Sequence, residues 1–185
     1  NKEIHRHFPD LPVILFGHSM GSFMARRYLM TYASELTGAI ICGTGYTPAA
    51  VLTTGKICAG LIGKLKGERH RSKFLQKLAF CSYNKRIADK RTENDWLTKD
   101  IEIVDAYNQD KYCTFLFTVN GYQTLFDVLG FIQKKENIEK IPKNLPLYMI
   151  AGVEDPVGNY GKGVEKIFQE YKACGIHDLE RKLYE

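Results

Sequence analysis

A serine between two glycines is the residue of this chain best suited to nucleophilic chemistry. Gly17-His18-Ser19-Met20-Gly21 matches the pattern G-x-S-x-G, in which a sharp strand-to-helix turn raises the serine hydroxyl above a sheet edge. Gly17 and Gly21 would let neighbouring backbone approach closely, because glycine has no Cβ. The N–H of Met20, at the start of the next helix, would stabilise an oxyanion. We therefore predict Ser19 as nucleophile and Met20 as an oxyanion donor.

The elements around this motif determine its meaning, because the short pattern also arises by chance as an ordinary glycine-rich turn. The apolar run Val13–Phe16 predicts a strand buried in a parallel sheet. A helix should follow, with one apolar stripe at i, i+3, i+4 and i+8 made by Met20, Phe23, Met24 and Tyr28. A second buried strand is expected over 38–43, which completes a βαβ unit. This context favours the catalytic interpretation.

A candidate acid follows a later strand. Leu147–Ala151 predicts a buried strand, and Asp155 comes just after its carboxyl end, where the active sites of α/β proteins collect. Pro156 favours an extended backbone at Asp155. An aspartate before proline is also a common turn, but the presence of Ser19 favours the catalytic role. Glu154 and Asp127 are weaker candidates.

The segment GHSMGS at Gly17–Ser22 resembles the elbow of the serine hydrolases grouped as S33 serine aminopeptidases, monoacylglycerol lipases and lysophospholipases. Leu145–Gly158 resembles the acid-bearing strand and loop of that family, and Trp96–Asp100 with Cys113–Tyr122 resembles its cap. The resemblance implies an α/β class: an α/β-hydrolase fold, with a parallel sheet flanked by helices and an inserted helical cap, incomplete at both ends. It also assigns Asp155 the role of orienting and stabilising a catalytic histidine.

The base of such a triad is not evident. In this fold the order along the chain is Ser, Asp, His, and only His177 follows Asp155. His177 lies at the wrong end of the last strand, and the resemblance puts the base after Glu185 and the second oxyanion donor before Asn1. His18 should be a buried structural histidine, since neighbouring side chains on a strand point in opposite directions. An unassisted serine is a weak nucleophile, so we expect these 185 residues alone to show little or no ester hydrolysis.

Three segments are expected. Residues 1–45 and 145–185 would form the α/β-hydrolase core, the latter with a helix whose stripe is Val164, Ile167, Phe168 and Tyr171 and with the start of a last strand at 179–185. Residues 46–144 show no convincing strand pattern and are too long for a loop, so they should form the helical cap or lid.

The resemblance implies a serine hydrolase of carboxylic esters, most similar to monoacylglycerol lipases and lysophospholipases, that forms an acyl-enzyme and needs no metal or organic cofactor. The partner would be a small lipid or ester, held by apolar cap side chains. The candidates for lining this site are Phe115, Phe117, Tyr122, Leu125 and Phe126, although a stripe at helical spacing is more often core. The alternatives are an aminopeptidase and a non-catalytic relative.

Composition and charge indicate the class of protein, its compartment and the partners it could bind. An apolar fraction of 44% and a charged fraction of 25% are typical of a soluble globular protein, and five scattered cysteines without a C-x-x-C pair suit free thiols in the cytoplasm, against a zinc site or a disulfide framework. Residues 56–91 carry eleven Lys/Arg against two acids. A solvated helical face explains this best; a basic rim for peripheral membrane contact is the alternative, and nucleic-acid binding is disfavoured because no motif accompanies the charge.

Overall fold

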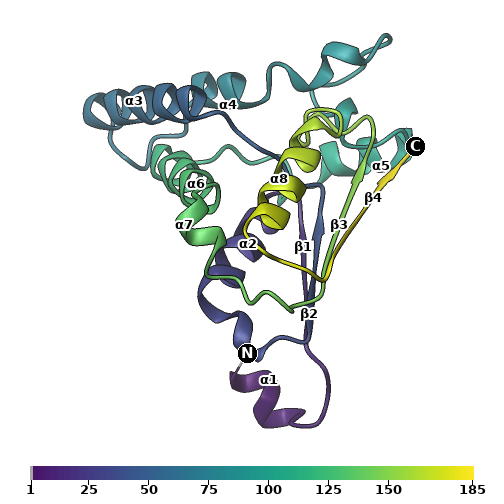
Figure 1. Ribbon diagram of the computed structural model, residues 1–185. Coiled ribbons are helices and arrows are strands. Elements are labelled where there is room, and N and C mark those ends of the chain that lie inside the picture. The colour runs from purple at the N-terminus through teal and green to yellow at the C-terminus, as the bar shows by residue number, and fades with distance from the viewer. Residues whose placement is uncertain (1) are drawn as a thin grey trace. The chain divides into compact units, whose positions relative to one another are not determined.

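The computed structural model describes residues 2–185 (Figure 1). Its strands are β1 (Ile14–His18), β2 (Gly38–Cys42), β3 (Leu147–Gly152) and β4 (Leu179–Tyr184). Its α-helices are α1 (Lys2–His7), α2 (Met20–Tyr32), α3 (Ala49–Lys66), α4 (Lys73–Phe80), α5 (Ile101–Gln109), α6 (Val119–Ile132), α7 (Lys135–Ile138) and α8 (Lys162–Ala173). Short 3₁₀ turns occupy Ala33–Glu35, Tyr83–Arg86 and Asp95–Leu97.

The chain divides into two compact units. The core unit contains the residues up to Tyr46 together with Val128–Glu185, and the helical unit contains Thr47–Asp127. The expected boundary at 144 is therefore wrong, because the end of α6 and all of α7 belong to the core unit. The physical reason is packing: the Phe131 ring lies 3.5 Å from the guanidinium of Arg27, and Ile138 is buried.

The core unit contains one parallel sheet with the strand order β1-β2-β3-β4. Because all four strands run in the same direction, their carboxyl ends share one edge, which is uppermost in Figure 1. Parallel strands joined through helices make this the α/β type of sheet expected from the sequence. The loops that follow β1, β2 and β3 meet at this edge.

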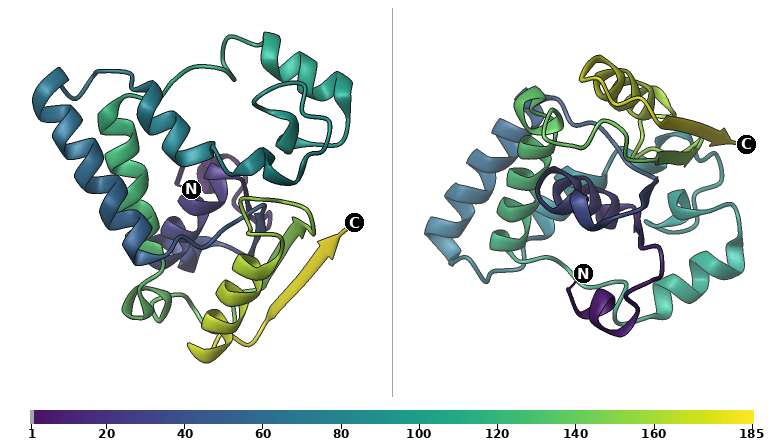
Figure 2. Two further views of the ribbon diagram at one scale, coloured as in Figure 1. Left: turned by 90° about the horizontal axis from the view of Figure 1, so that it is seen from above. Right: turned by 60° about the horizontal axis from the view of Figure 1, so that its bottom comes forward.

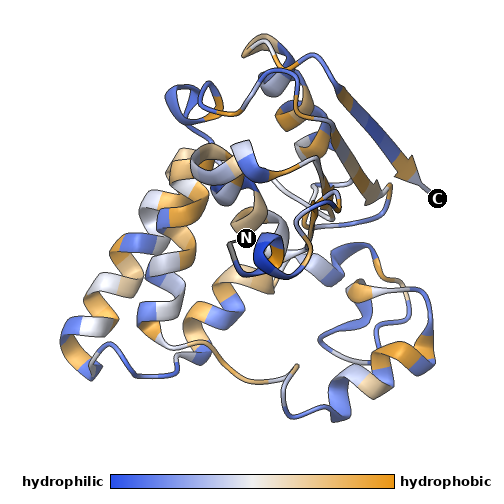
Figure 3. Cartoon of the chain, turned by 90° about the horizontal axis from the view of Figure 1, so that it is seen from below, coloured by the Kyte–Doolittle hydropathy of each residue, from blue (hydrophilic) through white to orange (hydrophobic). Residues whose placement is uncertain are grey.

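Helices α2 and α8 cover one face of the sheet, as Figure 1 and the views in Figure 2 show. The side chains that point toward these helices alternate along the strands and form the core with Leu29, Ile167 and Tyr171; they include Ala39, Ile41, Leu147, Met149 and Ala151. The opposite face carries more exposed side chains, including Ile14 and Phe16, each 59% exposed. Strand β4 is hydrophilic over most of its length (Figure 3), as its sequence LERKLY requires.

The predicted stripe of α2 is wrong in part. Met20 and Met24 are exposed, and the buried side of the helix consists of Ser22, Phe23, Ala25, Arg26, Leu29 and Met30. The tight turn at Ser19 fixes how α2 is rotated about its own axis. The side of the helix that includes the polar residues Ser22 and Arg26 therefore faces the sheet. By contrast, the stripe predicted for α8 is buried at all four positions, and Gly175, with φ +84°, follows its end as a glycine C-cap requires.

The helical unit has a core of its own, formed by Ala59, Leu75, Val119 and Tyr122. Phe126 packs on Gly55 of α3, where an added Cβ would lie 2.8 Å from the ring. The only β pairing within this unit, among the described residues, is an isolated bridge between Arg71 and Thr118. No helix in residues 2–185 combines the length and apolar character needed to cross a membrane.

The two glycines of the G-x-S-x-G pattern, Gly17 and Gly21, differ in their surroundings. A Cβ on Gly17 would lie 2.5 Å from the carbonyl oxygen of Gly21 and 2.6 Å from the Cβ of Ala25, so β1 and α2 touch through backbone at this point. A Cβ on Gly21 would meet no atom of the described chain within 4 Å. The expected close approach is therefore confirmed between Gly17 and the Gly21 carbonyl, whereas a side chain added at Gly21 would find open space.

We expect Gly17→Ala to destabilise the protein by about 1–3 kcal/mol, because neither contacting atom belongs to a flexible side chain. Gly21→Ala is the matched control and should leave stability unchanged or raise it by up to about 1 kcal/mol, the helix preference of alanine. Urea unfolding of both variants measures the difference. Equal losses of stability in the two variants would contradict the packing described here.

Candidate active site

Ser19 joins β1 directly to α2 in a backbone conformation that L-residues rarely adopt. Its φ is 51° and its ψ −120°. Such a conformation costs about 1–3 kcal/mol and persists only where the surrounding structure enforces it. Here the N–H of Ser19 donates to the carbonyl of Cys42 at the end of β2 (2.9 Å), and the Ser19 carbonyl accepts the N–H of Ser22 (2.9 Å). Ser19 is half-buried at the carboxyl edge of the sheet.

The start of α2 can support an oxyanion. Met20 is the first residue of the helix, so its N–H has no acceptor within the helix and points outward at the positive end of the dipole. The Ser22 hydroxyl is occupied elsewhere, because it donates to the Ser19 carbonyl at 2.5 Å. The N–H of Met20 therefore remains the donor that sequence reasoning assigned to this role.

Asp155 lies in the loop after β3, at the same edge of the sheet. Its Oδ1 accepts the N–H of Val157 at 2.8 Å. Burial raises the pKa of Asp155, while hydrogen bonds from the Val157 and Gly158 N–H groups and the nearby His18 act to lower it. The turn that follows is tight, with left-handed backbone at Asn159 (φ 49°) and Tyr160 (φ 56°) before Gly161.

His18 is exposed, so the prediction of a buried structural histidine is wrong. The reason lies in the register: His18 pairs with Cys42 at the last position of both strands, where no helix covers the side chain. Gly43 lies next to the His18 ring. A Cβ at Gly43 would lie 3.5 Å from Oδ2 of Asp155 and 3.7 Å from Nε2 of His18. The imidazole and the carboxylate thus face each other across a glycine whose φ is +59°.

The other histidines of the core unit lie away from this edge. His177 precedes β4 at the amino edge of the sheet, where its backbone N–H donates to the Lys143 carbonyl (2.9 Å). His5 contacts the Glu35 carbonyl, and His7 contacts the carboxylate of Glu3. None of these contacts involves Ser19 or Asp155, and a base from outside these residues stays a prediction.

The two alternative acids have other surroundings. Asp127 forms an ion pair with Lys56 (2.6 Å) inside the helical unit, and its side chain is 71% exposed. Glu154 precedes Asp155 in the loop but is exposed. Of the three carboxylates weighed from the sequence, Asp155 is therefore the one that is partly buried and held by backbone N–H groups.

Three of the five predicted lining residues belong to the core of the helical unit. Tyr122 is 0% exposed, and Phe117 and Phe126 pack against it. The Tyr122 hydroxyl donates to the side-chain carbonyl of Gln76, and burial raises the pKa of Tyr122 to about 12. Tyr122 therefore serves packing, and its prediction as a lining residue is wrong. Phe115 is exposed and Leu125 half-buried, and their role stays a prediction.

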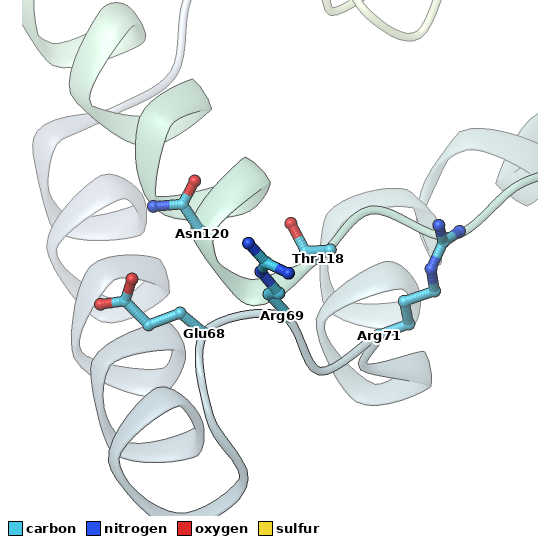
Figure 4. Close-up of a pocket in the computed structure, with 5 residues that line it drawn as sticks. All are labelled: Glu68, Arg69, Arg71, Thr118 and Asn120. Carbon is cyan, nitrogen blue, oxygen red and sulfur yellow. The ribbon is translucent and has the colours of Figure 1, made fainter.

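The helical unit also carries a polar pocket of about 560 Å³, lined by Glu68, Arg69, Arg71, Thr118 and Asn120 (Figure 4). The backbone N–H groups beside this pocket already have acceptors: that of Val119 donates to the His70 carbonyl and that of Asn120 to the Glu68 carbonyl. These two N–H groups of α6 are therefore not available to an anion. None of the predicted site residues lines this pocket.

Sequence reasoning missed the loop that contacts the turn after Asp155. Gly43, Thr44 and Gly45 follow β2, and a Cβ on Gly45 would lie 2.1 Å from the Val157 carbonyl oxygen. A signal was present: two glycines around one threonine directly after a buried strand indicate a close backbone approach. Arg26, which donates hydrogen bonds to Thr44 and Gly45 of this loop, lies on the buried side of α2. The sequence did not single it out, because the predicted apolar stripe placed the wrong side of α2 against the sheet.

Comparison with solved structures finds close likeness over nearly the whole chain. A thermostable carboxyl esterase from Bacillus coagulans is 30% identical, with a TM-score of 0.89, and the match covers 99% of this chain and 59% of the esterase. A lipase in its open form is 26% identical with a TM-score of 0.82, again over 99% of this chain and 59% of the lipase. A monoglyceride lipase from Saccharomyces cerevisiae, 20% identical with a TM-score of 0.69 over 99% and 55% of the two chains, shows the same fold.

This chain therefore spans about three-fifths of the length of these relatives. A comparison with curated proteins finds no significant match. The family model described as serine aminopeptidase, S33, matches residues 1–185. With the parallel sheet and the esterases and lipases that share it, this match shows that the chain belongs to the S33 serine aminopeptidase family of α/β-hydrolases.

Proposed function

We propose that the complete protein containing this chain hydrolyses carboxylic esters, with Ser19 as nucleophile and Asp155 as the acid of a Ser-Asp-His triad. The observation that carries the proposal is the shared edge: Ser19 follows β1 in a strained turn and Asp155 follows β3, both at the carboxyl end of one parallel sheet. The esterase and lipase relatives support the same class of reaction.

In the proposed reaction, Ser19 Oγ attacks the ester carbonyl carbon while a histidine takes the hydroxyl proton. The carbonyl oxygen becomes an oxyanion, which the Met20 N–H stabilises. Collapse of the intermediate expels the alcohol, which receives the proton, and leaves an acyl-enzyme; water then releases the acid and restores the serine. Asp155 would orient the histidine and stabilise its charged form. The histidine itself is proposed to come from a part of the protein outside residues 1–185.

The substrate class is proposed to be small lipids or esters of the monoacylglycerol and lysophospholipid type. The support is likeness to lipases together with the apolar character of the helical unit, which we propose acts as the cap. Turnover of aminoacyl amides but not of esters would instead select an aminopeptidase. Failure of the serine to react at all would favour a non-catalytic relative.

We further propose that segment 56–91 of the helical unit contacts anionic lipid surfaces. Its charge balance of +9 is accompanied by exposed apolar side chains on α3, where Ile57, Leu61 and Leu65 follow one another at i, i+4 and i+8 and are 58%, 57% and 83% exposed. Phe74 on α4 is also exposed, at 59%. Apolar side chains among lysines suit insertion below an anionic headgroup layer.

Ser19→Ala in the complete protein should reduce kcat on p-nitrophenyl esters by at least about 10³-fold and abolish labelling by a fluorophosphonate probe, because the nucleophile is lost. Ser22→Ala is the matched control, since its hydroxyl only caps the turn, and it should still be labelled. Labelling that persists in Ser19→Ala would rule out Ser19 as the nucleophile.

Asp155→Asn should stabilise the chain of residues 1–185, which lacks the proposed histidine partner, at pH 7. The pKa of Asp155 is raised in the folded state, so its ionisation reduces the free energy of unfolding as the pH rises through the folded pKa, above the unfolded value of about 3.9. The gain in Tm should shrink toward pH 3, where the carboxyl is protonated in both states. Thermal unfolding between pH 3 and 7 measures this, with the exposed Asp178→Asn as control. A lower Tm for Asp155→Asn at pH 7 would contradict it.

The lipid contact predicts binding to anionic vesicles. Ile57→Glu with Leu61→Glu should reduce co-sedimentation with phosphatidylserine-containing vesicles by about ten-fold or more, since carboxylates oppose both insertion and charge attraction. The control is Ile101→Glu with Ile103→Glu on α5, which are 56% and 59% exposed. If both pairs behave alike, or if the wild type binds no vesicles, the proposed contact is wrong.

A further inference from the structure

A fully buried arginine lies behind the candidate site. Arg26 is 0% exposed and stands two helical turns after Ser19 on α2. Its Nη1 donates to Thr44 Oγ1 (3.3 Å) and to the Gly45 carbonyl (3.1 Å). Its Nε donates to the Tyr171 hydroxyl (3.3 Å), and its Nη2 to the Ile132 carbonyl (3.4 Å).

Within residues 2–185, the oxygens that accept these hydrogen bonds are all neutral. A buried guanidinium without a carboxylate partner is costly, and an apolar side chain of similar volume would often fill such a space at least as stably. The contribution of Arg26 is therefore geometric: one rigid fork of donors joins α2, the loop after β2, the end of α6 and α8.

The loop that Arg26 holds is the support of the acid turn. A Cβ on Gly45 would lie 2.1 Å from the Val157 carbonyl oxygen, and a Cβ on Gly158 would lie 3.2 Å from the Thr44 carbonyl oxygen. These two backbones are therefore in direct contact. The N–H of Val157 in turn donates to Oδ1 of Asp155 at 2.8 Å. Any displacement of Thr44 and Gly45 must move the carboxylate through Val157.

We propose that Arg26 is a positioning residue that fixes the location of the Asp155 carboxylate relative to Ser19. Its own helix begins at Ser19, and its Nη1 hydrogen bonds hold the loop on which the acid turn rests. Arg26 does not touch the reacting atoms; it acts through Gly45 and Val157. The effect of Arg26 on the position of the Asp155 carboxylate can be tested without any assumption about activity. Only the expected effect on ester turnover rests on the proposed function.

Two substitutions separate positioning from general stability. Thr44→Val and Tyr171→Phe each remove one hydrogen-bond acceptor of Arg26, the first toward the acid loop and the second toward α8; both residues are fully buried. Thr44→Ser keeps the hydroxyl and is the rescue variant. The variants are made in the complete protein, with Tm measured for each.

The readout that does not depend on activity is hydrogen exchange of the Val157 amide, measured by NMR. Thr44→Val should accelerate it by about ten-fold or more relative to the average core amide, because the bond to Asp155 loosens. Tyr171→Phe should leave that ratio within about two-fold even where its Tm falls equally, and Thr44→Ser should restore it.

In ester turnover, Thr44→Val should lower kcat by about ten-fold or more with KM changed less than about two-fold, since a small misplacement of a catalytic group costs rate more than binding. Equal effects of Thr44→Val and Tyr171→Phe on the Val157 amide and on kcat, or no rescue by Thr44→Ser, would overturn the proposal. Absence of turnover and of probe labelling in the wild type would overturn the proposed function instead, while the exchange measurement still decides the role of Arg26.

Discussion

The contact between Gly17 and the first two turns of α2 is the constraint on which the candidate site depends. Backbone of β1 meets the carbonyl of Gly21 and the Cβ of Ala25 with no room for a side chain. Strand and helix can approach so closely only if the chain reverses within one residue. Ser19 is that residue, and its left-handed backbone follows from the reversal. The backbone conformation of Ser19 is thus a consequence of packing two residues earlier.

The same edge of the sheet concentrates features that cost stability. Ser19 is strained, Asp155 is a carboxylate whose pKa is raised by burial, and Gly43 adopts a left-handed conformation between His18 and Asp155. Such costs are tolerated where the rest of the fold is well packed, and they cluster at sites where geometry and charge matter more than stability. The helix-covered face of the sheet, with Ile41, Met149 and Ile167 buried, supplies that packing.

Apolar residues of the helical unit could either line a binding site or form the core of the unit. Its aromatic and aliphatic residues suggested a lining for an acyl chain, yet Tyr122, Phe117 and Phe126 close a core around Ala59 and Leu75. Because these side chains stabilise the unit itself, they are not free to line a site without opening it. The apolar residues left outside this core, such as Ile57 and Leu61 on α3, are the ones that can contact a partner.

Local signals in the sequence were sufficient to predict the parallel strands, the tight turn at Ser19 and the loop with Asp155 after β3. A buried apolar run, a glycine-bracketed serine and an aspartate after a strand are set by residues adjacent in the chain, so Ser19 and Asp155 could be selected without coordinates. Tertiary contacts decided the rest. The phase of α2, the exposure of His18, the difference between Gly17 and Gly21, and the link from Arg26 through Gly45 to Val157 join segments that are distant in sequence. No local pattern encodes such contacts, because each depends on which faces meet when the strands pair.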